Sequence, residues 1–393
     1  MIREKLYTET AKAFQSRMSH ISRFVDLRYA SEDKYYDEKS KHNIPLTEEE
    51  LESCKNFWNQ FFIEGSELIS YRMLEGYKVF EKDSNKLQYY IPDGFWYGII
   101  DEYYANPMRS ESIDDKNLYD ILFHDIHRAE TIFRKVGNVF YDKDYVEISK
   151  EDAIAKCLHN KQVVIKNTFG SFGGHGVHFI DAEKNSVAEI EKLFDDKLNM
   201  ANSKSSPRKE IQLIAQSVVK QHHTLSAIND TSINTIRIMT LLFNGEVKVL
   251  SSVLRMGVNG SKVDNASSGG IVVGINPDGT LKDFAVNCKA DIFYTHPNGT
   301  NFAGVQLEGY DKAVELCKKL QNRFASVSKL ISWDIAIDEN GEPLLIEMNI
   351  AFGELDFHQM CNGPILGTEL IKEVLADVIN NSTTLRFILE ARV

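Results

Sequence analysis

Three residues near the C-terminus have side chains that could hold a metal ion. Asp334 lies in an apolar, strand-like run, Glu347 and Asn349 lie two apart in the next such run, and the turn-forming residues 338–342 separate the runs. The pattern predicts a β-hairpin with Glu347 and Asn349 on one face. Two carboxylates and an amide oxygen suit Mg²⁺ bound against phosphates. The alternative is an edge hairpin with two ordinary polar positions, but an unpaired charge inside an apolar strand is costly to bury.

A second motif joins a lysine to a glycine-rich segment. Lys166 ends the strand-like run 163–166, and the following residues 167–177 contain four glycines and His175. Glycines let backbone N–H groups approach phosphates, and a lysine supplies a point charge for them. The spacing matches neither the P-loop nor the dinucleotide fingerprint. A tight hairpin is the alternative interpretation for the glycines. His175 could contact phosphate or act as a base, or it could be a solvated loop residue.

Two arginines form the third element. Arg237 and Arg255 each lie in an apolar, strand-like run, and the small polar segment 264–270, with Asn265 and a Gly-Gly pair, follows the second. A guanidinium held in such a place can bind phosphate or carboxylate oxygens in a bidentate manner. Pairing with a surface carboxylate is the alternative for either arginine.

In this order the elements resemble the ATP-grasp superfamily over residues 111–370, and more narrowly the sugar-transfer-associated ATP-grasp proteins. The resemblance implies an α+β ATP-grasp fold, in which two α+β subdomains grip ATP. It also implies a role for each matching residue. The residues that would contact the nucleotide are Lys116, Lys166, Gly173, Gly174, Gly176 and the hinge residues Gln216, Ser217 and Val219. The catalytic residues would be Arg237, Arg255 and Asn265. The metal ligands would be Asp334, Glu347 and Asn349.

Three positions depart from the family pattern. Asn167 follows the second lysine where many relatives have proline, and Gln216 stands where the adenine-binding hinge often begins with glutamate. Ser332 lies two before Asp334, where peptide-ligase relatives place arginine. The last departure makes a D-alanine:D-alanine ligase a less attractive interpretation.

The resemblance implies an ATP- and Mg²⁺-dependent carboxylate-amine ligase that forms an amide through an acylphosphate. Two Mg²⁺ ions are expected, with Mn²⁺ as a substitute. The expected partners are a small carboxylate, from an amino acid or a sugar, and an amine or amino sugar, in polysaccharide or cell-surface glycan biosynthesis. A kinase acting on a small hydroxyl compound and a non-catalytic ATP-binding module are the alternatives.

Composition narrows the class of protein. The 393 residues are 43% hydrophobic and carry a net charge of −12, which indicates a globular protein and argues against broad binding to nucleic acids or anionic membranes. The N-terminus lacks an apolar signal core and no apolar run is long enough to span a membrane, so we expect a cytoplasmic protein without membrane insertion. The odd number of scattered cysteines fits reduced thiols rather than a zinc site or disulfides; these are Cys54, Cys157, Cys288, Cys317 and Cys361.

The elements that must position these motifs divide into two domains. Residues 1–110 are predicted to be helical, with helical spacing over 11–27 and 51–62 and a helix start at 45–50, and they could contact the acceptor, a second copy or polysaccharide-assembly enzymes. Residues 111–393 form the expected ATP-grasp domain, divided near 215/216. Its predicted elements are strands 162–166, 211–219 and 234–243, a helix over 186–197 and a polar loop over 202–209. Five aromatic residues of the first domain are expected to pack in a core or between domains, with a ligand-binding set as the alternative: Trp58, Phe61, Phe62, Trp96 and Tyr97.

Four further residues have two interpretations each. His222 and His223 follow the hinge and could frame a ribose or lie on the surface. Asp356 and His358 follow the metal hairpin and could face the acceptor or cap a helix.

Overall fold

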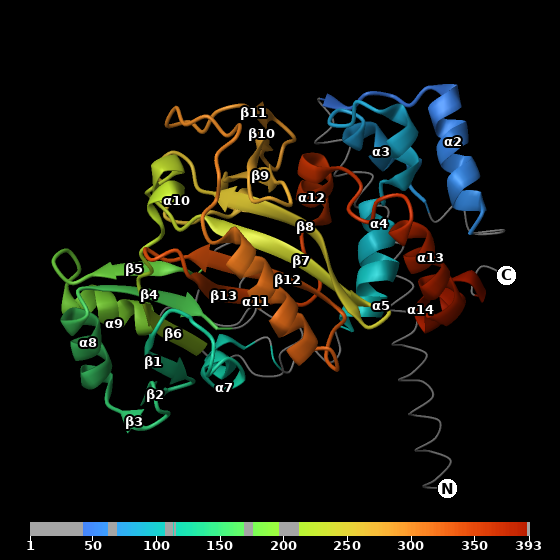
Figure 1. Ribbon diagram of the computed structural model, residues 1–393. Helices are drawn as coiled ribbons and strands as arrows, with labels where there is room; N and C mark the ends of the chain where they lie inside the picture. Colours follow the sequence, from blue (N-terminus) through green and yellow to red (C-terminus); the bar gives the residue numbers. More distant parts are fainter. Residues whose placement is uncertain are drawn as a thin grey trace, which may run out of the picture. The chain divides into compact units, whose positions relative to one another are not determined.

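The computed structural model of the protein describes residues 42–61, 69–106, 113, 115–168, 176–195 and 212–390. They form two compact units, one made of the chain up to Ala105 together with the chain from Glu354 onward, and the other of Asn106–Gly353 (Figure 1). The helix expected over 11–27, the loop over 202–209 and Phe62 lie outside the described residues. No helix in the described ranges is long and apolar enough to cross a membrane.

The first unit is helical. Thr47 caps α2 (Glu48–Asn59) with a capping box, in which its hydroxyl accepts from the Glu50 N–H and the Glu50 carboxylate accepts from the Thr47 N–H. Trp58 and Trp96 are buried in the core, as expected. The elements are α2 Glu48–Asn59, α3 Tyr71–Tyr77, η3 Ser84–Tyr89, α4 Asp93–Phe95, η4 Trp96–Ile100, α5 Asp101–Ala105, α12 Leu355–Asn362, α13 Leu370–Asn381 and α14 Thr383–Glu390.

The C-terminal helices complete this first unit. The side chain of Gln359 in α12 accepts from the Ile91 N–H at 2.9 Å and donates to the Ile91 carbonyl at 2.8 Å. Tyr104 in α5 donates to Asp377 in α13 at 2.7 Å. The sequence interpretation placed residues 354–393 in the second domain, whereas these contacts bind the C-terminal helices to the N-terminal ones.

A six-stranded antiparallel sheet forms one part of the second unit. Its strand order is β3-β2-β1-β6-β4-β5. Helices α8 (Lys150–His159) and α9 (Val187–Asp195) pack on it, and Ile154, Cys157 and Phe194 share a buried core with the strands. The strands are β1 Thr131–Val136, β2 Val139–Asp142, β3 Glu147–Ile148, β4 Gln162–Asn167, β5 His178–Asp181 and β6 Gln212–Ser217.

A seven-stranded antiparallel sheet forms the other part, in the order β11-β10-β9-β8-β7-β12-β13. Helix α11 (Tyr310–Arg323) crosses one face of this sheet, where Cys317 and Leu320 join its core (Figure 1). The short elements η5 Lys116–Leu118, α7 Tyr119–Leu122, α10 His223–Ile228 and η7 Ala266–Ser268 lie in the connections. The strands are β7 Thr235–Phe243, β8 Glu246–Met256, β9 Ile271–Ile275, β10 Leu281–Val286, β11 Ile292–Phe293, β12 Leu330–Ile337 and β13 Pro343–Asn349.

The predicted metal hairpin is confirmed as β12 and β13, with a bulge beside Asp334. Asp334 pairs with Glu347, whereas Ile335 pairs with Leu345, so Ile346 is an extra residue on β13. Leu345 and Met348 both belong to the buried core. The bulge changes the alternation of faces between these two residues, and Glu347 is thereby kept off the core face.

Candidate active site

Asp334 lies at the centre of a buried network of charged side chains. Its carboxylate accepts two hydrogen bonds from Arg237, Nε to Oδ1 and Nη2 to Oδ2, each at 2.7 Å. Arg255 Nη1 and Asn349 Nδ2 both donate to Oδ2 at 3.3 Å. The side chains of Arg237 and Asp334 are each 6% exposed. Burial alone would raise the pKa of Asp334, but the two guanidinium groups hold it below its usual range.

Strand pairing explains why these side chains meet. Asp334 on β12 lies opposite Arg237 on β7 and opposite Glu347 on β13. Arg255 on β8 pairs with Thr235, two residues before Arg237. Residues opposite one another on neighbouring strands share a face, so four adjacent strands present these groups together.

Arg255 extends the network to the segment after β8. Its Nη2 donates to Asn265 Oδ1 and lies 4.0 Å from Asp264 Oδ1. Thr235 donates its hydroxyl proton to Asp264. Burial raises the pKa of Asp264, and the charge of Arg255 opposes that rise only in part.

Two lysines lie near Glu347. Lys116 Nζ donates to Glu347 Oε1 at 2.6 Å, and its backbone N–H donates to the Thr168 carbonyl at 3.0 Å, next to the end of β4. Lys166 is on β4. Burial and the nearby charge of Lys116 lower the pKa of Lys166 to about 8.

The charges of this cluster do not cancel. A lysine whose pKa is lowered by a second ammonium group is stabilised by an incoming anion. Within the described residues, the cluster contains four cationic side chains (Lys116, Lys166, Arg237 and Arg255) and three carboxylates (Asp264, Asp334 and Glu347). The excess of one positive charge, on buried and half-buried groups, suits a polyanion such as a triphosphate.

The predicted hinge is the end of the central strand β6. Ser217 donates its N–H to the Glu130 carbonyl at 2.9 Å, and its hydroxyl accepts from the Glu130 N–H at 3.1 Å. Gln216 Nε2 donates to the Ala129 carbonyl at 3.5 Å. Gln216, Ser217 and Val219 are all half-buried.

The glycine-rich segment is described only at its end. Gly173, Gly174 and His175 lie outside the described residues. Gly176 has a positive φ of +77°, and a Cβ added there would lie 2.5 Å from Asn167 Nδ2. Asn167, the departure from proline noted above, therefore packs against a glycine.

The remaining candidate residues belong to other elements. Asp356 and His358 are in α12 of the first unit, and His358 is buried. His222 and His223 lie at the start of α10, with ring centroids 4.2 Å apart. All five cysteines are free, and burial raises the pKa of Cys54 and Cys157 to about 12, which does not suit a nucleophile.

Sequence reasoning gave Asp264 and Thr235 no role, although both belong to the network. Asp264 precedes Asn265 in the segment identified for catalysis, and its position beside a predicted ligand was the signal available. Thr235 begins β7 two residues before Arg237, so period-two alternation places both on one face.

Comparison with known proteins identifies the class of protein. Residues 100–374 match the model of a family described as sugar-transfer associated ATP-grasp. Among curated proteins no match to the sequence was found. Since the match covers well over half of the chain, this is an ATP-grasp protein. The chain belongs to the sugar-transfer associated ATP-grasp family.

Several solved structures are similar to this chain at low identity. D-alanyl-alanine synthetase A from Vibrio cholerae is 15% identical with a TM-score of 0.38, and the match covers 71% of this chain and 67% of that one. An L-amino acid ligase from Bacillus licheniformis is 14% identical, with a TM-score of 0.37 and coverages of 69% and 48%. The biotin carboxylase domain of a Hydrogenobacter thermophilus 2-oxoglutarate carboxylase is 13% identical, with a TM-score of 0.41 and coverages of 68% and 46%. The chain thus spans about half the length of the last two proteins, and family membership rests on the sequence match.

Proposed function

We propose that the protein is an ATP- and Mg²⁺-dependent carboxylate-amine ligase. The observation that carries the proposal is the juxtaposition of two hydrogen-bonded groups, because Asp334 and Glu347 lie opposite each other on β12 and β13. Lys116 binds Glu347, and Arg237 and Arg255 bind Asp334, at 2.6–3.3 Å. Membership of an ATP-grasp family supports ATP as the co-substrate. Cations for a triphosphate, oxygen donors for a metal and arginines for a second anion are all present in one unit.

The nucleotide is held by the two lysines and the hinge. Lys116 and Lys166 contact the phosphates together with the glycine-rich segment, and backbone groups from Gln216 to Val219 read the adenine. A bound phosphate would stabilise the positive charge of Lys166, because an anion raises the pKa that burial has lowered.

The oxygen donors fit Mg²⁺, the cation that an ATP-grasp site implies. Asp334, Glu347 and Asn349 provide two carboxylates and an amide from neighbouring strands. A carboxylate has about four acceptor positions; Glu347 uses one for Lys116, whereas Asp334 accepts from Arg237, Arg255 and Asn349. The two 3.3 Å contacts to Asp334 are the weakest, so they would give way to a cation. Bound Mg²⁺ would neutralise the charge that develops on the phosphates.

The arginines act on the second substrate. The substrate carboxylate attacks the terminal phosphorus of ATP, which forms an acylphosphate and releases ADP. An amine then attacks the acyl carbon, loses a proton and expels phosphate, which leaves an amide. Arg237, Arg255 and Asn265 stabilise the acylphosphate and the tetrahedral adduct, a role in which one donor is worth about 3 to 4 kcal/mol.

The family description directs the choice of substrates. A sugar-transfer association supports an amino acid or sugar-derived carboxylate and an amine or amino-sugar acceptor in polysaccharide or cell-surface glycan biosynthesis. Such small molecules are also consistent with the excess of one positive charge, which fits ATP and a second small anion.

The test is Mg²⁺-dependent ADP release from the full chain with pooled carboxylates, each measured with and without amines and amino sugars. Release that needs both pools and disappears in Glu347→Ala is the expected result. Glu339→Ala, which removes an exposed carboxylate in the turn of the same hairpin, is the control and keeps the rate. A phosphorylated product formed from a hydroxyl compound without amine would instead indicate a kinase. Tight ATP binding without turnover for any pairing would indicate a binding module.

A further inference from the structure

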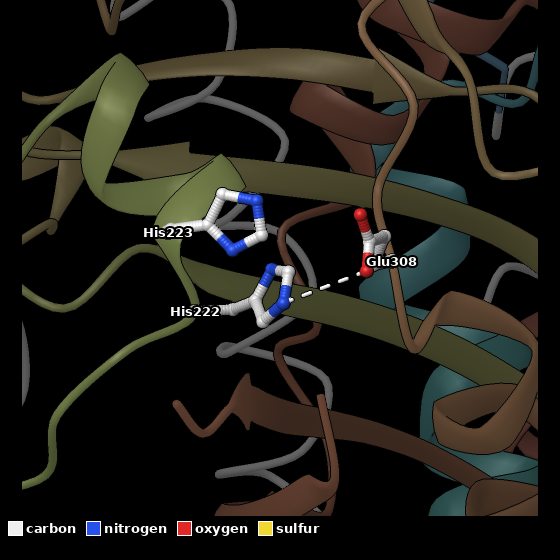
Figure 2. Close-up of side chains that lie close together, drawn as sticks. All are labelled: His222, His223 and Glu308. Carbon is white, nitrogen blue, oxygen red and sulfur yellow. Dashed lines mark ion pairs between the residues drawn. The ribbon is translucent and has the colours of Figure 1, made fainter. Parts of the chain in front are cut away.

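A second cluster of ligand-type side chains lies apart from the charged network. His222, His223 and Glu308 each offer one ligand atom, and these atoms lie within 4.8 Å of one another. Figure 2 shows the His222 ring directed at the Glu308 carboxylate, with the His223 ring above it. We infer that these three residues form a site for a divalent transition-metal ion of the zinc class, in addition to the Mg²⁺ site.

His222 is fixed in the manner of a metal ligand. Its side chain is 7% exposed, and its Nε2 lies 3.5 Å from Glu308 Oε2. Its Nδ1 lies 2.9 Å from the Thr224 hydroxyl oxygen. A histidine that binds metal through one nitrogen commonly donates the other N–H to a neighbouring oxygen. In the metal-free chain Nδ1 accepts from the Thr224 backbone N–H at 3.4 Å, so the proton is on Nε2, facing Glu308. Metal binding at Nε2 would move that proton to Nδ1, from which the Thr224 hydroxyl oxygen can accept it.

The segments that carry the ligands are both held by the β12–β13 hairpin. The His222 N–H donates to the Ile337 carbonyl at 2.9 Å. Gly309, next to Glu308, has a φ of +80°, and a Cβ there would lie 2.7 Å from the Gly341 carbonyl oxygen. Each backbone therefore packs directly on the hairpin. The distance between the ligand segments is set by the fold.

The donor set determines which metal fits. Two imidazoles and one carboxylate match three-ligand zinc sites that keep an open position for water, with bonds of about 2.0 to 2.2 Å. Such bonds need ligand atoms closer than 4.8 Å, and the exposed side chains of His223 and Glu308, the latter 59% exposed, can rotate to close the gap. Mg²⁺ prefers oxygen ligands, so the two sites select different ions. Bound zinc would cross-link the segment after β6 to the segment before α11.

Zinc binding to the metal-stripped full chain, measured by calorimetry with Zn²⁺ alone, tests the inference. One ion per chain is expected to depend on these residues, with affinity reduced at least about tenfold in His223→Ala and in Glu308→Ala. Thr224→Val should weaken binding about 10- to 100-fold through His222. His127→Ala is the matched control, because it removes an exposed imidazole that lies 3.9 Å from a single carboxylate oxygen, that of Asp338. Bound Co²⁺ should give the visible absorption of a four-coordinate site in the wild type and in the control.

Three results would overturn the inference. One is the absence of saturable zinc binding by the wild type. Another is zinc affinity that stays unchanged in both His223→Ala and Glu308→Ala. The last is weaker ADP binding in His223→Ala with unchanged zinc affinity, which would assign the imidazoles to the nucleotide. None of these readouts uses ligase activity, so the inference and the proposed function fail independently.

Discussion

Asp334 has two roles that require different contacts of its carboxylate. As a partner of Arg237 and Arg255 it neutralises two buried guanidinium groups, and as a proposed metal ligand it must share its oxygens with a cation. Glu347 has a lighter structural task, because its side chain is 26% exposed and its partner is the single ammonium of Lys116. The two carboxylates are therefore expected to separate stability from activity.

Asp334→Asn should destabilise the protein and also abolish Mg²⁺-dependent turnover. Removal of the charge takes from two buried arginines the carboxylate that both contact, which costs about 3 to 5 kcal/mol in the free energy of unfolding. Glu347→Gln should also lose turnover, but its free energy of unfolding should change by less than about 1 kcal/mol, because the ion pair of Glu347 is partly exposed. Urea denaturation measures both. An Asp334→Asn variant as stable as Glu347→Gln would show that Asp334 does not balance the arginines.

Lys166→Met should raise stability near pH 7 and weaken ATP binding. The folded pKa of Lys166, about 8, lies below its ordinary value of 10.5, so the unfolded chain binds more protons between these two values. The penalty is then complete below pH 8 and is relieved as the pH rises toward 10.5. The stability gain of the variant should therefore shrink across that window, as measured by denaturation at several pH values. The affinity for ATP should fall about 10- to 100-fold. If the variant and the wild type bound ATP equally well, Lys166 would not be part of the nucleotide site.

At the level of elements, the sequence predicted the strands better than the pairing between them. The predicted strands 162–166 and 234–243 are confirmed as β4 and β7, because long apolar runs and turn residues mark them. The bulge at Ile346 was not predicted, since nothing in the apolar residues of β13 distinguishes an extra residue from a regular one. That bulge decides which face Glu347 takes. The sequence placed Glu347 and Asn349 on one face, but only the register shows Asp334 across from Glu347.

The end of the glycine-rich segment provides a prediction at this scale. Gly176→Ala should weaken ATP binding, because the new Cβ would lie 2.5 Å from the Asn167 side chain and the residue must also keep a positive φ. Gly245→Ala is the matched control: its φ is +80° and nothing lies within 4 Å of its Cβ. Both should lose about 1 to 2 kcal/mol from backbone strain. Only Gly176→Ala should change the ATP dissociation constant, and adding Asn167→Ala should restore part of the affinity; a loss of equal size in Gly245→Ala would contradict a local effect.

At the scale of the whole molecule, contacts between distant parts of the chain were the least predictable. Glu308 and His222 lie close together in space but far apart in the sequence, and no periodic pattern in the sequence indicates their contact. The same holds for the C-terminal helices, whose apolar faces fit any helical neighbour, so their place with residues 42–105 follows only from specific pairs such as Gln359 with Ile91. Local patterns predict elements, whereas the partner of an element depends on shape.

Gln359 is therefore expected to hold the two ends of the chain in one cooperative unit. It is fully buried, and Gln359→Ala leaves the Ile91 N–H and carbonyl without their partner, which costs about 1 to 3 kcal/mol for each unsatisfied group. Hydrogen exchange should rise together in residues 84–105 and 355–386, because units of this kind open cooperatively.

Gln321→Ala is the matched control for that experiment. Gln321 is also fully buried and forms two hydrogen bonds, accepting from Thr240 at 2.8 Å and donating to the Ser328 carbonyl at 2.9 Å, but it belongs to α11 in the second unit. Its loss should raise exchange in α11 and β12 and leave residues 84–105 unchanged. If Gln359→Ala raised exchange in α12 alone, the C-terminal helices would not unfold cooperatively with the N-terminal ones. The first unit would then derive its stability from residues 42–105 without them.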